Sequence, residues 1–322
     1  MEQTMIKTEN VSKRFGSFAL QDIHFELPAG YICGLIGENG VGKTTLLNIL
    51  AGLYEYDGTI SIQEKEYRTN QMELQQDIGF VFHEEWFDDW DSLIANSRHY
   101  GKYYKNYDET LLKEYLKRFR LDGKKKYKKL SKGEKLKFAF AFALAHHPKL
   151  LLLDEPGVGV DPLSRRELWK MVSELAVGGM SVLWSTAYMD EAERCAHVLM
   201  LDQGSLVYQG PPAGFTGRVA KRVFSFVPPS GEARAMLARW QQEPDIRDAL
   251  IQGNRIRVVL RNPHDGPFSR KGVELHPVEP RLEDAYIDAV GGMDQRPSPF
   301  LPVRGRGGAE DPGEGRGNFS GE

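Results

Sequence analysis

A glycine-rich stretch at residues 37–45, with the sequence GENGVGKTT, constrains this chain more than any other feature. It matches the pattern G-x-x-x-x-G-K-[ST], in which Gly37, Gly42, Lys43 and Thr44 occupy the fixed positions. Glycines allow such a loop to curl until its backbone N–H groups point inward at phosphate oxygens. The lysine can then reach the β- and γ-phosphates, and the threonine hydroxyl can bind Mg²⁺. The stretch therefore predicts a nucleotide phosphate site.

The segments on both sides of this loop support the prediction. Residues 31–36 (YICGLI) read as a buried strand, and residues 46–51 (LLNILA) open a helix. Phosphates would then lie at the N-terminus of that helix, where backbone N–H groups and the helix dipole favour negative charge. Asn39, Gly40 and Thr45 belong to the same loop and are included in the predicted binding site.

A second chemical feature is the run LLLLDE at residues 150–155. Four consecutive leucines indicate a strand that is buried on both faces, as in the centre of a parallel sheet. The strand ends in Asp154 and Glu155, directly before Pro156. Because α/β sheets bind ligands at the carboxyl ends of their strands, we expect both carboxylates to face a bound ligand.

The remaining pattern predicts an α/β domain followed by a smaller α+β unit. Strand-like segments and helical periodicity alternate up to about residue 215, and residues 84–145 are mostly helical. We therefore expect a nucleotide-binding domain at 1–215, with a helical part at about 84–145, and an α+β unit at 216–290. Residues 291–322 are rich in Gly, Pro and charge, so we expect them to form a disordered tail. Expected strands are 6–11, 18–27, 58–63, 78–82, 181–185, 222–227, 255–260 and 273–276, and expected helices are 107–120, 164–176, 232–242 and 280–290.

Composition excludes several other classes of protein. The net charge of −3 gives no global field that would hold nucleic acid or an anionic membrane. Residues 124–137 contain eight lysines but one aromatic residue, a pattern that most often marks a solvated face, so we expect no nucleic-acid partner. The two cysteines, Cys33 and Cys195, favour a reducing, cytosolic setting, and no signal peptide is seen. The longest apolar run, 138–145, is far shorter than the roughly 20 residues of a membrane span, so a membrane role would need a partner.

Phe15 lies beside Gly16 on a predicted turn. Ordinary packing at the edge of a sheet would explain an aromatic residue there. The alternative is that its ring provides a platform on which a purine base stacks.

Together these residues resemble the ATP-binding cassette (ABC) ATPases, in particular the ATP-binding subunits of ABC-2-type exporters, over about residues 5–215. The loop at 37–44 is similar to the family's P-loop, and LSKGE at 130–134 resembles the signature LSGGQ. Asp154 ends a Walker B-like strand and Glu155 stands at the position of the catalytic glutamate. GVDP at 159–162 looks like the D-loop, and Phe15 stands where the adenine-stacking aromatic is expected.

The resemblance implies ATP and Mg²⁺ as cofactors. Asp154 and Thr44 would hold the metal, while Glu155 would polarise the attacking water and Lys43 would neutralise phosphate charge. It also implies a head-to-tail pair of cassettes, as a homodimer or a heterodimer, with ATP held between one phosphate loop and the other signature. Ser131 and Gly133 would then contact the γ-phosphate across that interface, with Asp161 of the D-loop nearby. A separate transmembrane permease subunit is the second implied partner, and the chain would lie in the cytoplasm on the inner face of the membrane.

Two positions depart from the family pattern. His83 replaces a glutamine that contacts Mg²⁺ or the lytic water and couples to the membrane domain. Because Mg²⁺ prefers oxygen ligands, we expect His83 to act through a water or by positioning. Ala187 stands at the position of the switch histidine, and a methyl group cannot donate a hydrogen bond to the γ-phosphate. We therefore expect impaired hydrolysis.

The two parts of the chain resemble different branches of the family. Residues 1–149 look like lysine-rich exporter ATPases of low-GC Gram-positive bacteria, and residues 150–290 resemble the first cassette of Gram-negative exporters with two cassettes in one chain. Of 20 lysines, 17 lie in residues 1–150, whereas 17 of 22 arginines lie in residues 151–322. A hybrid or truncated cassette is therefore one hypothesis.

Other functional classes fit less well. ABC proteins that act on ribosomes carry two cassettes in one chain, and only one phosphate loop occurs in this sequence. ABC-type DNA-repair ATPases need a long coiled-coil insert, which the sequence lacks. A nucleotide-binding cassette with degenerate or silent hydrolysis, acting as a regulatory partner, stays open because of Ala187.

Overall fold

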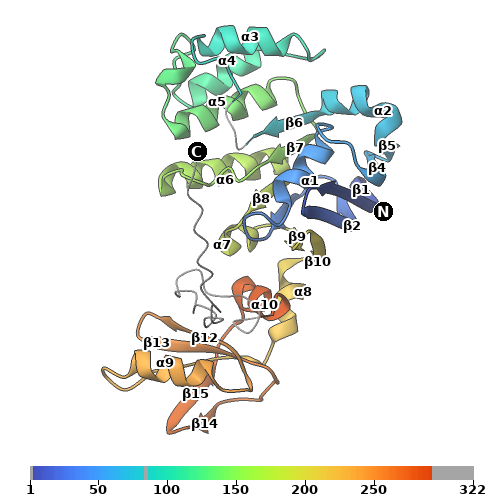
Figure 1. Ribbon diagram of the computed structural model, residues 1–322. Helices are drawn as coiled ribbons and strands as arrows, with labels where there is room; N and C mark the ends of the chain where they lie inside the picture. The colour runs from blue at the N-terminus through green and yellow to red at the C-terminus, as the bar shows by residue number, and fades with distance from the viewer. Residues whose placement is uncertain (1–2, 83–85, 292–322) are drawn as a thin grey trace, which may run out of the picture.

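The computed structural model describes residues 3–82 and 86–291. These residues form sheets of four, six and five strands together with a helical layer. Figure 1 shows the six-stranded sheet in the middle, the helical layer above it, and the five-stranded sheet below. The order of these parts follows the alternation of strands and helices along the sequence.

The six-stranded sheet has the order β10-β9-β3-β8-β7-β6. Every neighbouring pair is parallel except β9 and β10. All four residues of β7 are buried, as the leucine run predicts for a central strand. The strands are β3 (Ile32–Ile36), β6 (Ile78–Val81), β7 (Leu150–Leu153), β8 (Ser181–Thr186), β9 (His197–Asp202) and β10 (Ser205–Gly210).

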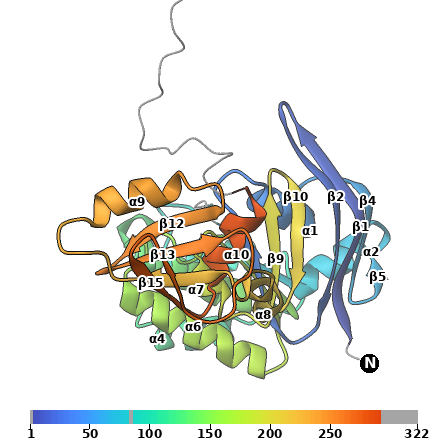
Figure 2. The same cartoon turned by 90° about the horizontal axis from the view of Figure 1, so that it is seen from below.

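The N-terminal sheet is antiparallel, with the order β2-β1-β4-β5. It shares one apolar core with α1 (Lys43–Leu50) and with one face of the six-stranded sheet, so α1 lies between the two sheets. Figure 2 shows this arrangement from below. Its strands are β1 (Thr4–Phe15), β2 (Phe18–Pro28), β4 (Asp57–Ile62) and β5 (Lys65–Glu66).

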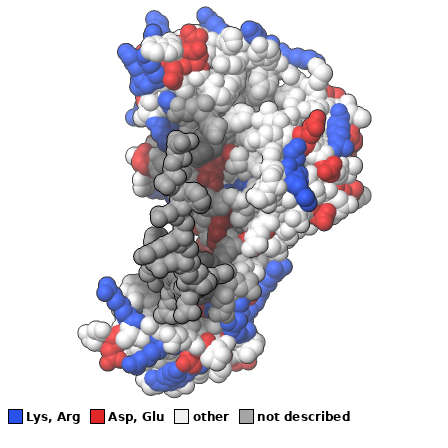
Figure 3. All heavy atoms as spheres, in the orientation of Figure 1, with Lys and Arg blue, Asp and Glu red and all other residues white. Residues whose placement is uncertain are grey.

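The helical layer packs around an aromatic core that includes Phe87, Phe138 and Phe142. It contains α3 (Leu93–Gly101), α4 (Glu109–Arg118) and α5 (Lys132–Leu144). The helix expected at 107–120 is confirmed as α4, which begins after Asp108 because that side chain accepts hydrogen bonds from the first backbone N–H groups. On the face shown in Figure 3, basic and acidic side chains are interspersed over this layer.

The C-terminal sheet is antiparallel, with the order β12-β13-β11-β15-β14. α9 (Ala233–Gln241) covers one face, where the rings of Phe226 and Trp240 lie 4.8 Å apart. α10 (Leu282–Ala289) joins the other face to the core that surrounds α6 (Pro162–Val177). The strands are β11 (Val223–Phe226), β12 (Ile246–Gln252), β13 (Arg255–Leu260), β14 (Phe268–Arg270) and β15 (Val273–Pro277).

Some elements differ from the expectation. α6 begins at Pro162, two residues before the predicted start, because Asp161 caps it and proline suits the first helical position. Five strands were not predicted, namely β5, β9, β10, β12 and β14. Three α-helices were also not predicted: α2 (Tyr67–Leu74), α7 (Met189–Ala192) and α8 (Pro212–Thr216). The same holds for the short 3₁₀ helices Gln75–Asp77, Tyr127–Lys129 and Gly217–Val219. The expected domain limits stay a prediction, and residues 292–322 of the expected disordered tail lie outside the described residues.

Candidate nucleotide-binding site

The predicted phosphate loop lies between β3 and α1, at the carboxyl edge of the six-stranded sheet. Gly40 and Gly42 have φ angles of 86° and 111°, in the region that favours glycine. A β-carbon at Gly37 would lie 2.5 Å from the carbonyl oxygen of Leu201. These positions explain why the loop needs glycine. Asn39 is exposed on the loop, and Thr45 is half-buried in the first turn of α1.

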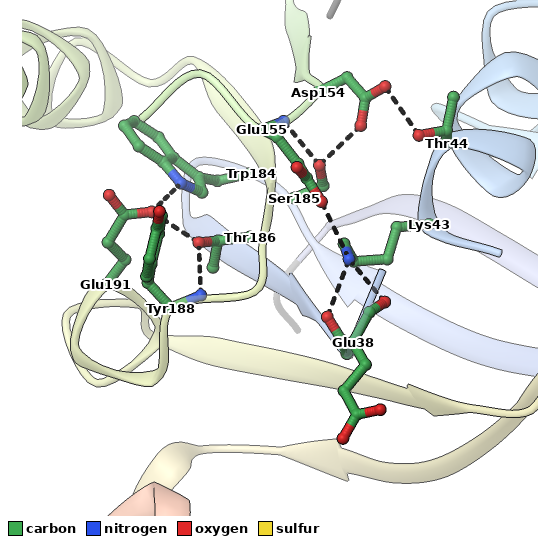
Figure 4. A network of polar contacts seen from close by, with 11 residues as sticks. Glu38, Lys43, Thr44, Asp154, Glu155, Trp184, Ser185, Thr186, Tyr188 and Glu191 are labelled. Carbon is green, nitrogen blue, oxygen red and sulfur yellow. Dashed lines mark hydrogen bonds and ion pairs between the residues drawn. The ribbon is translucent and has the colours of Figure 1, made fainter. Parts of the chain in front are cut away.

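Lys43 is buried, with 4 % of its surface exposed. Its Nζ donates hydrogen bonds of 2.8 Å and 2.9 Å to the carbonyl oxygens of Gly37 and Glu38. The same atom lies 3.0 Å from Oε1 of Glu155 (Figure 4). The lysine ammonium is therefore fixed inside the loop and faces the carboxylate at the end of β7.

Asp154 connects two structural elements at the edge of the sheet. The Thr44 hydroxyl donates a 2.9 Å hydrogen bond to Oδ2 of Asp154. The Ser185 hydroxyl donates a 2.8 Å hydrogen bond to Oδ1 of Asp154 and accepts one of 2.8 Å from the backbone N–H of Glu155. The sequence analysis missed Ser185. Its position as the last residue of the strand predicted at 181–185 was the available signal.

The Thr44 and Asp154 side chains fit a Mg²⁺ ion. Mg²⁺ prefers oxygen ligands and commonly takes one or two protein oxygens together with phosphate oxygens. The two oxygens that the resemblance assigns to the metal lie 2.9 Å apart, close enough to share one ion. Within residues 3–82 and 86–291 no group of three or more His, Cys, Asp or Glu side chains could hold a metal ion, so the candidate set needs oxygens from a ligand.

The backbone of Glu155 has a φ of 46°, which is uncommon for a residue with a large side chain. Its carboxylate is largely buried, with 16 % of the side chain exposed. No sequence pattern indicated this backbone conformation.

Phe15 lies at the tip of the hairpin formed by β1 and β2, where it pairs with Phe18. The residue is 40 % exposed, and its ring makes an edge contact with Tyr54, with 5.2 Å between ring centroids. A cavity of about 670 Å³ lies next to this hairpin, and its lining includes Phe18, Asn39 and Gly40. The site therefore has an open space beside the phosphate loop.

The other predicted site residues lie apart from the phosphate loop. Ser131 caps α5 in a reciprocal arrangement with Glu134, and a side chain at Gly133 would meet open space. Asp161 caps α6, and the hydrogen bond from the Ser164 N–H holds the pKa of that carboxyl below its usual value. Among the described residues, no hydrogen bond or ion pair joins these residues to the loop at 37–44. His83 lies outside the described residues.

The segment that contains Ala187 carries a network that the sequence analysis missed. Oε2 of Glu191 accepts hydrogen bonds from Nε1 of Trp184 at 3.0 Å and from the Thr186 hydroxyl at 2.7 Å (Figure 4). The Thr186 hydroxyl in turn accepts a 3.0 Å hydrogen bond from the backbone N–H of Tyr188. Glu191 is 1 % exposed, so a buried carboxylate fixes the end of β8.

Comparison with known proteins places these features in a family. The family model described as ABC transporter matches residues 20–158. The probable multidrug ABC transporter ATP-binding protein YbhF of Escherichia coli (strain K12) is 36% identical, over 93% of this chain and 54% of its own length. The chain thus spans about half the length of this relative. The Nod factor export ATP-binding protein I of Burkholderia lata is 34% identical, over 64% of this chain and 71% of its own length.

A solved structure shows the same relationship. CbiO1 of Clostridium perfringens, described as part of the ABC transporter complex cbiONQ, superposes with a TM-score of 0.59 at 27% identity. The superposition covers 67% of this chain and 92% of that protein. In the part of this chain that the structure describes, no helix is both long and apolar enough to span a membrane.

Proposed function

The chain belongs to the ATP-binding proteins of ABC transporters, and from this membership we propose that it binds ATP with Mg²⁺ and hydrolyses it to energise export through a separate transmembrane subunit. Two contacts support the proposal most directly: the hydrogen bond between Thr44 and Asp154 and the ion pair between Lys43 and Glu155. They join two segments that are distant in the sequence. Each of the four residues has the chemistry that phosphoryl transfer from ATP to water requires.

Lys43 would supply the fixed positive charge of the site. Its Nζ has three acceptors within 3.0 Å, namely two loop carbonyls and the Glu155 carboxylate. A phosphate oxygen that takes the place of Glu155 on this ammonium would free the carboxylate to accept a hydrogen bond from a water molecule. Glu155 would then orient that water for in-line attack on the γ-phosphate.

Thr44 and Asp154 would hold Mg²⁺, which supplies neutralisation of phosphate charge when it is bound. Ser185 would keep Asp154 oriented, since its hydroxyl donates to the oxygen that does not face Thr44. Phe15 would contribute a ring for stacking with the base, because it is exposed at the tip of its hairpin.

We propose that Ser131, Gly133 and Asp161 act in a pair of cassettes. The start of α5 is open to an approaching ligand, as the free space around Gly133 indicates. Exposed lysines lie on both sides of Ser131, among them Lys129 and Lys132, and their charge would favour the phosphates of an ATP molecule carried by the second cassette. His83 stays a proposed positioning residue of the same site.

A membrane partner would need a surface on this chain. A groove of about 680 Å³ lies between β6 and the helical layer, with Phe80, Phe82, Trp86, Tyr100 and Tyr104 among its lining residues. Phe82, which lines the groove, directly precedes in the sequence the position that, by family resemblance, couples to the membrane domain. We propose that it receives a segment of the transmembrane subunit on the inner face of the membrane.

A regulatory cassette with silent hydrolysis is the second candidate function, and Ala187 favours it. Its methyl group provides no hydrogen bond for the γ-phosphate, whereas the binding residues of the phosphate loop are intact. Steady-state phosphate release from Mg-ATP separates the two functions. Turnover that the Glu155→Gln variant abolishes supports the enzyme, and ATP binding without turnover supports the regulatory cassette.

A further inference from the structure

The loop that follows Glu155 is held at its first residue by β8. The backbone N–H of Glu155 donates a 2.8 Å hydrogen bond to the Ser185 hydroxyl, and its carbonyl accepts a 3.1 Å hydrogen bond from Val158. The left-handed φ of 46° at Glu155 is a conformation that persists only where surrounding contacts enforce it.

Two charged side chains from different helices meet the backbone of Gly157. The Arg165 guanidinium, on α6, donates a 3.4 Å hydrogen bond to the Gly157 carbonyl. A β-carbon at Gly157 would lie 2.5 Å from Oε1 of Glu191 and 3.5 Å from Nε of Arg165. Hence the arginine contacts the loop backbone at Gly157, and a larger residue at this position would force the Glu191 carboxylate to shift.

Arg165 and Glu191 also face each other. Nε of Arg165 lies 3.7 Å from Oε1 of Glu191, and neither of these two buried atoms has a hydrogen-bond partner among the described residues. A buried carboxylate needs a nearby cation, because an unpaired buried charge is costly. Within the described part of the chain, Arg165 is the only cation that forms an ion pair with Glu191.

Together these contacts connect both ends of the loop to β8. Glu191 is anchored to β8 through Thr186 and Trp184, and β8 holds the N–H of Glu155 through Ser185. The Arg165 guanidinium carbon also lies 5.0 Å from the ring centroid of Tyr188, in the segment that contains Ala187. Arg165 thus contacts both the loop after Glu155 and the segment after β8.

We infer that Arg165 and Glu191 are positioning residues that hold Glu155 in its strained conformation and so direct its carboxylate toward Lys43. The inference rests on the proposed function, in which Glu155 orients the attacking water. In the proposed mechanism neither residue touches the phosphates. Both act through the backbone of Gly157.

The test compares the full-length chain with the variants Arg165→Met and Glu191→Gln. Arg166→Met and Asp190→Asn are matched controls, because these exposed neighbours make no described contact with the loop.

Hydrogen–deuterium exchange of the peptide at 154–160 is measured first. We expect exchange in this loop to become at least about tenfold faster in both variants, with the strands β3 and β9 unchanged and both controls like the wild type.

Turnover provides the second readout. If the wild type hydrolyses ATP, kcat should fall about 10- to 100-fold in Arg165→Met, while ATP affinity changes by less than about threefold. Arg165→Lys, which keeps the charge beside Glu191, should recover part of the loss. Unchanged loop exchange in both variants, or equal acceleration throughout the protein, would overturn the inference. A wild type without turnover counts against the proposed hydrolysis, and the exchange measurement still decides the positioning role.

Discussion

Thr44 and Asp154 are separated by 110 positions in the sequence, yet their side chains share a 2.9 Å hydrogen bond. The contact joins the first turn of α1 to the end of β7, so the phosphate loop and the sheet edge form one site. Ser185 holds the second oxygen of Asp154 from β8. Contacts from α1 and β8 therefore hold Asp154, at the end of β7, in the candidate metal position.

Ser185→Ala should weaken this site and the fold together. The substitution leaves the backbone N–H of Glu155 and Oδ1 of Asp154 without their present partner. A buried polar group that loses its partner costs about 1 to 3 kcal/mol, so the free energy of unfolding should fall by a similar amount. Urea unfolding measures this loss, and ATP titration at fixed Mg²⁺ should show weaker binding. Ser173→Ala, on the surface of α6, is the control and should change neither quantity.

Phe15→Ala tests the proposed stacking of the base. Aromatic stacking contributes about 0.5 to 1.5 kcal/mol, so ATP affinity should fall about 2- to 12-fold. Isothermal titration with ATP and with inorganic triphosphate makes the comparison. The substitution should weaken ATP binding alone, because triphosphate has no base. An equal loss for both ligands would show that Phe15 supports the hairpin rather than the base.

Ala187→His tests whether a missing contact limits hydrolysis. One preorganised contact to developing charge contributes about 2.7 to 4 kcal/mol to the transition state. Turnover should therefore rise by up to about 10² to 10³-fold, with no gain in ATP affinity. Phosphate release and nucleotide titration give the two values. Vigorous wild-type turnover that the substitution leaves unchanged would contradict this explanation.

His146 predicts a dependence of stability on pH. The side chain is 1 % exposed, and burial lowers the pKa of its imidazole from 6.5 to about 4. Between these values the unfolded chain binds a proton that the folded chain does not. The contribution is therefore complete above about pH 6.5 and is lost as the pH falls towards 4, by about 1.4 kcal/mol per pH unit. Urea unfolding at pH 4.5, 5.5 and 7 should show a steeper loss for the wild type than for His146→Gln, and parallel slopes would contradict the prediction.

Much of the fold could be predicted because its central elements have strong local signals. The leucine run of β7 and the glycines of the phosphate loop correctly indicated a buried strand and a sharp turn at the sheet edge. β12 was missed because the sequence IRDALIQ mixes charges with apolar residues, and its pairing with β13 decides its structure. α2 was missed because the sequence YRTNQMEL has no apolar stripe.

The candidate site was predictable only in part. Lys43, Thr44, Asp154 and Glu155 belong to motifs that the sequence reveals, and in the structure Thr44 meets Asp154 and Lys43 meets Glu155. The roles of Arg165 and Glu191 depend on the packing of α6 against α7, which no local pattern encodes. The hypothesis of two origins for the chain stays a prediction, although ion pairs such as Lys137 with Glu167 join its two parts.

The most direct test of the nucleotide site is titration of Mg-ATP into the wild type and into Lys43→Ala. Nζ of Lys43 lies within 3.0 Å of two loop carbonyls and Glu155, at the place where we propose that the phosphates bind. Hydrogen bonds to charged groups contribute about 1.5 to 3 kcal/mol, so affinity should fall at least about tenfold in the variant. Lys65→Ala, which removes a surface ion pair with Glu73, is the control and should bind like the wild type. Equal affinity of Lys43→Ala and the wild type would contradict the proposed phosphate site.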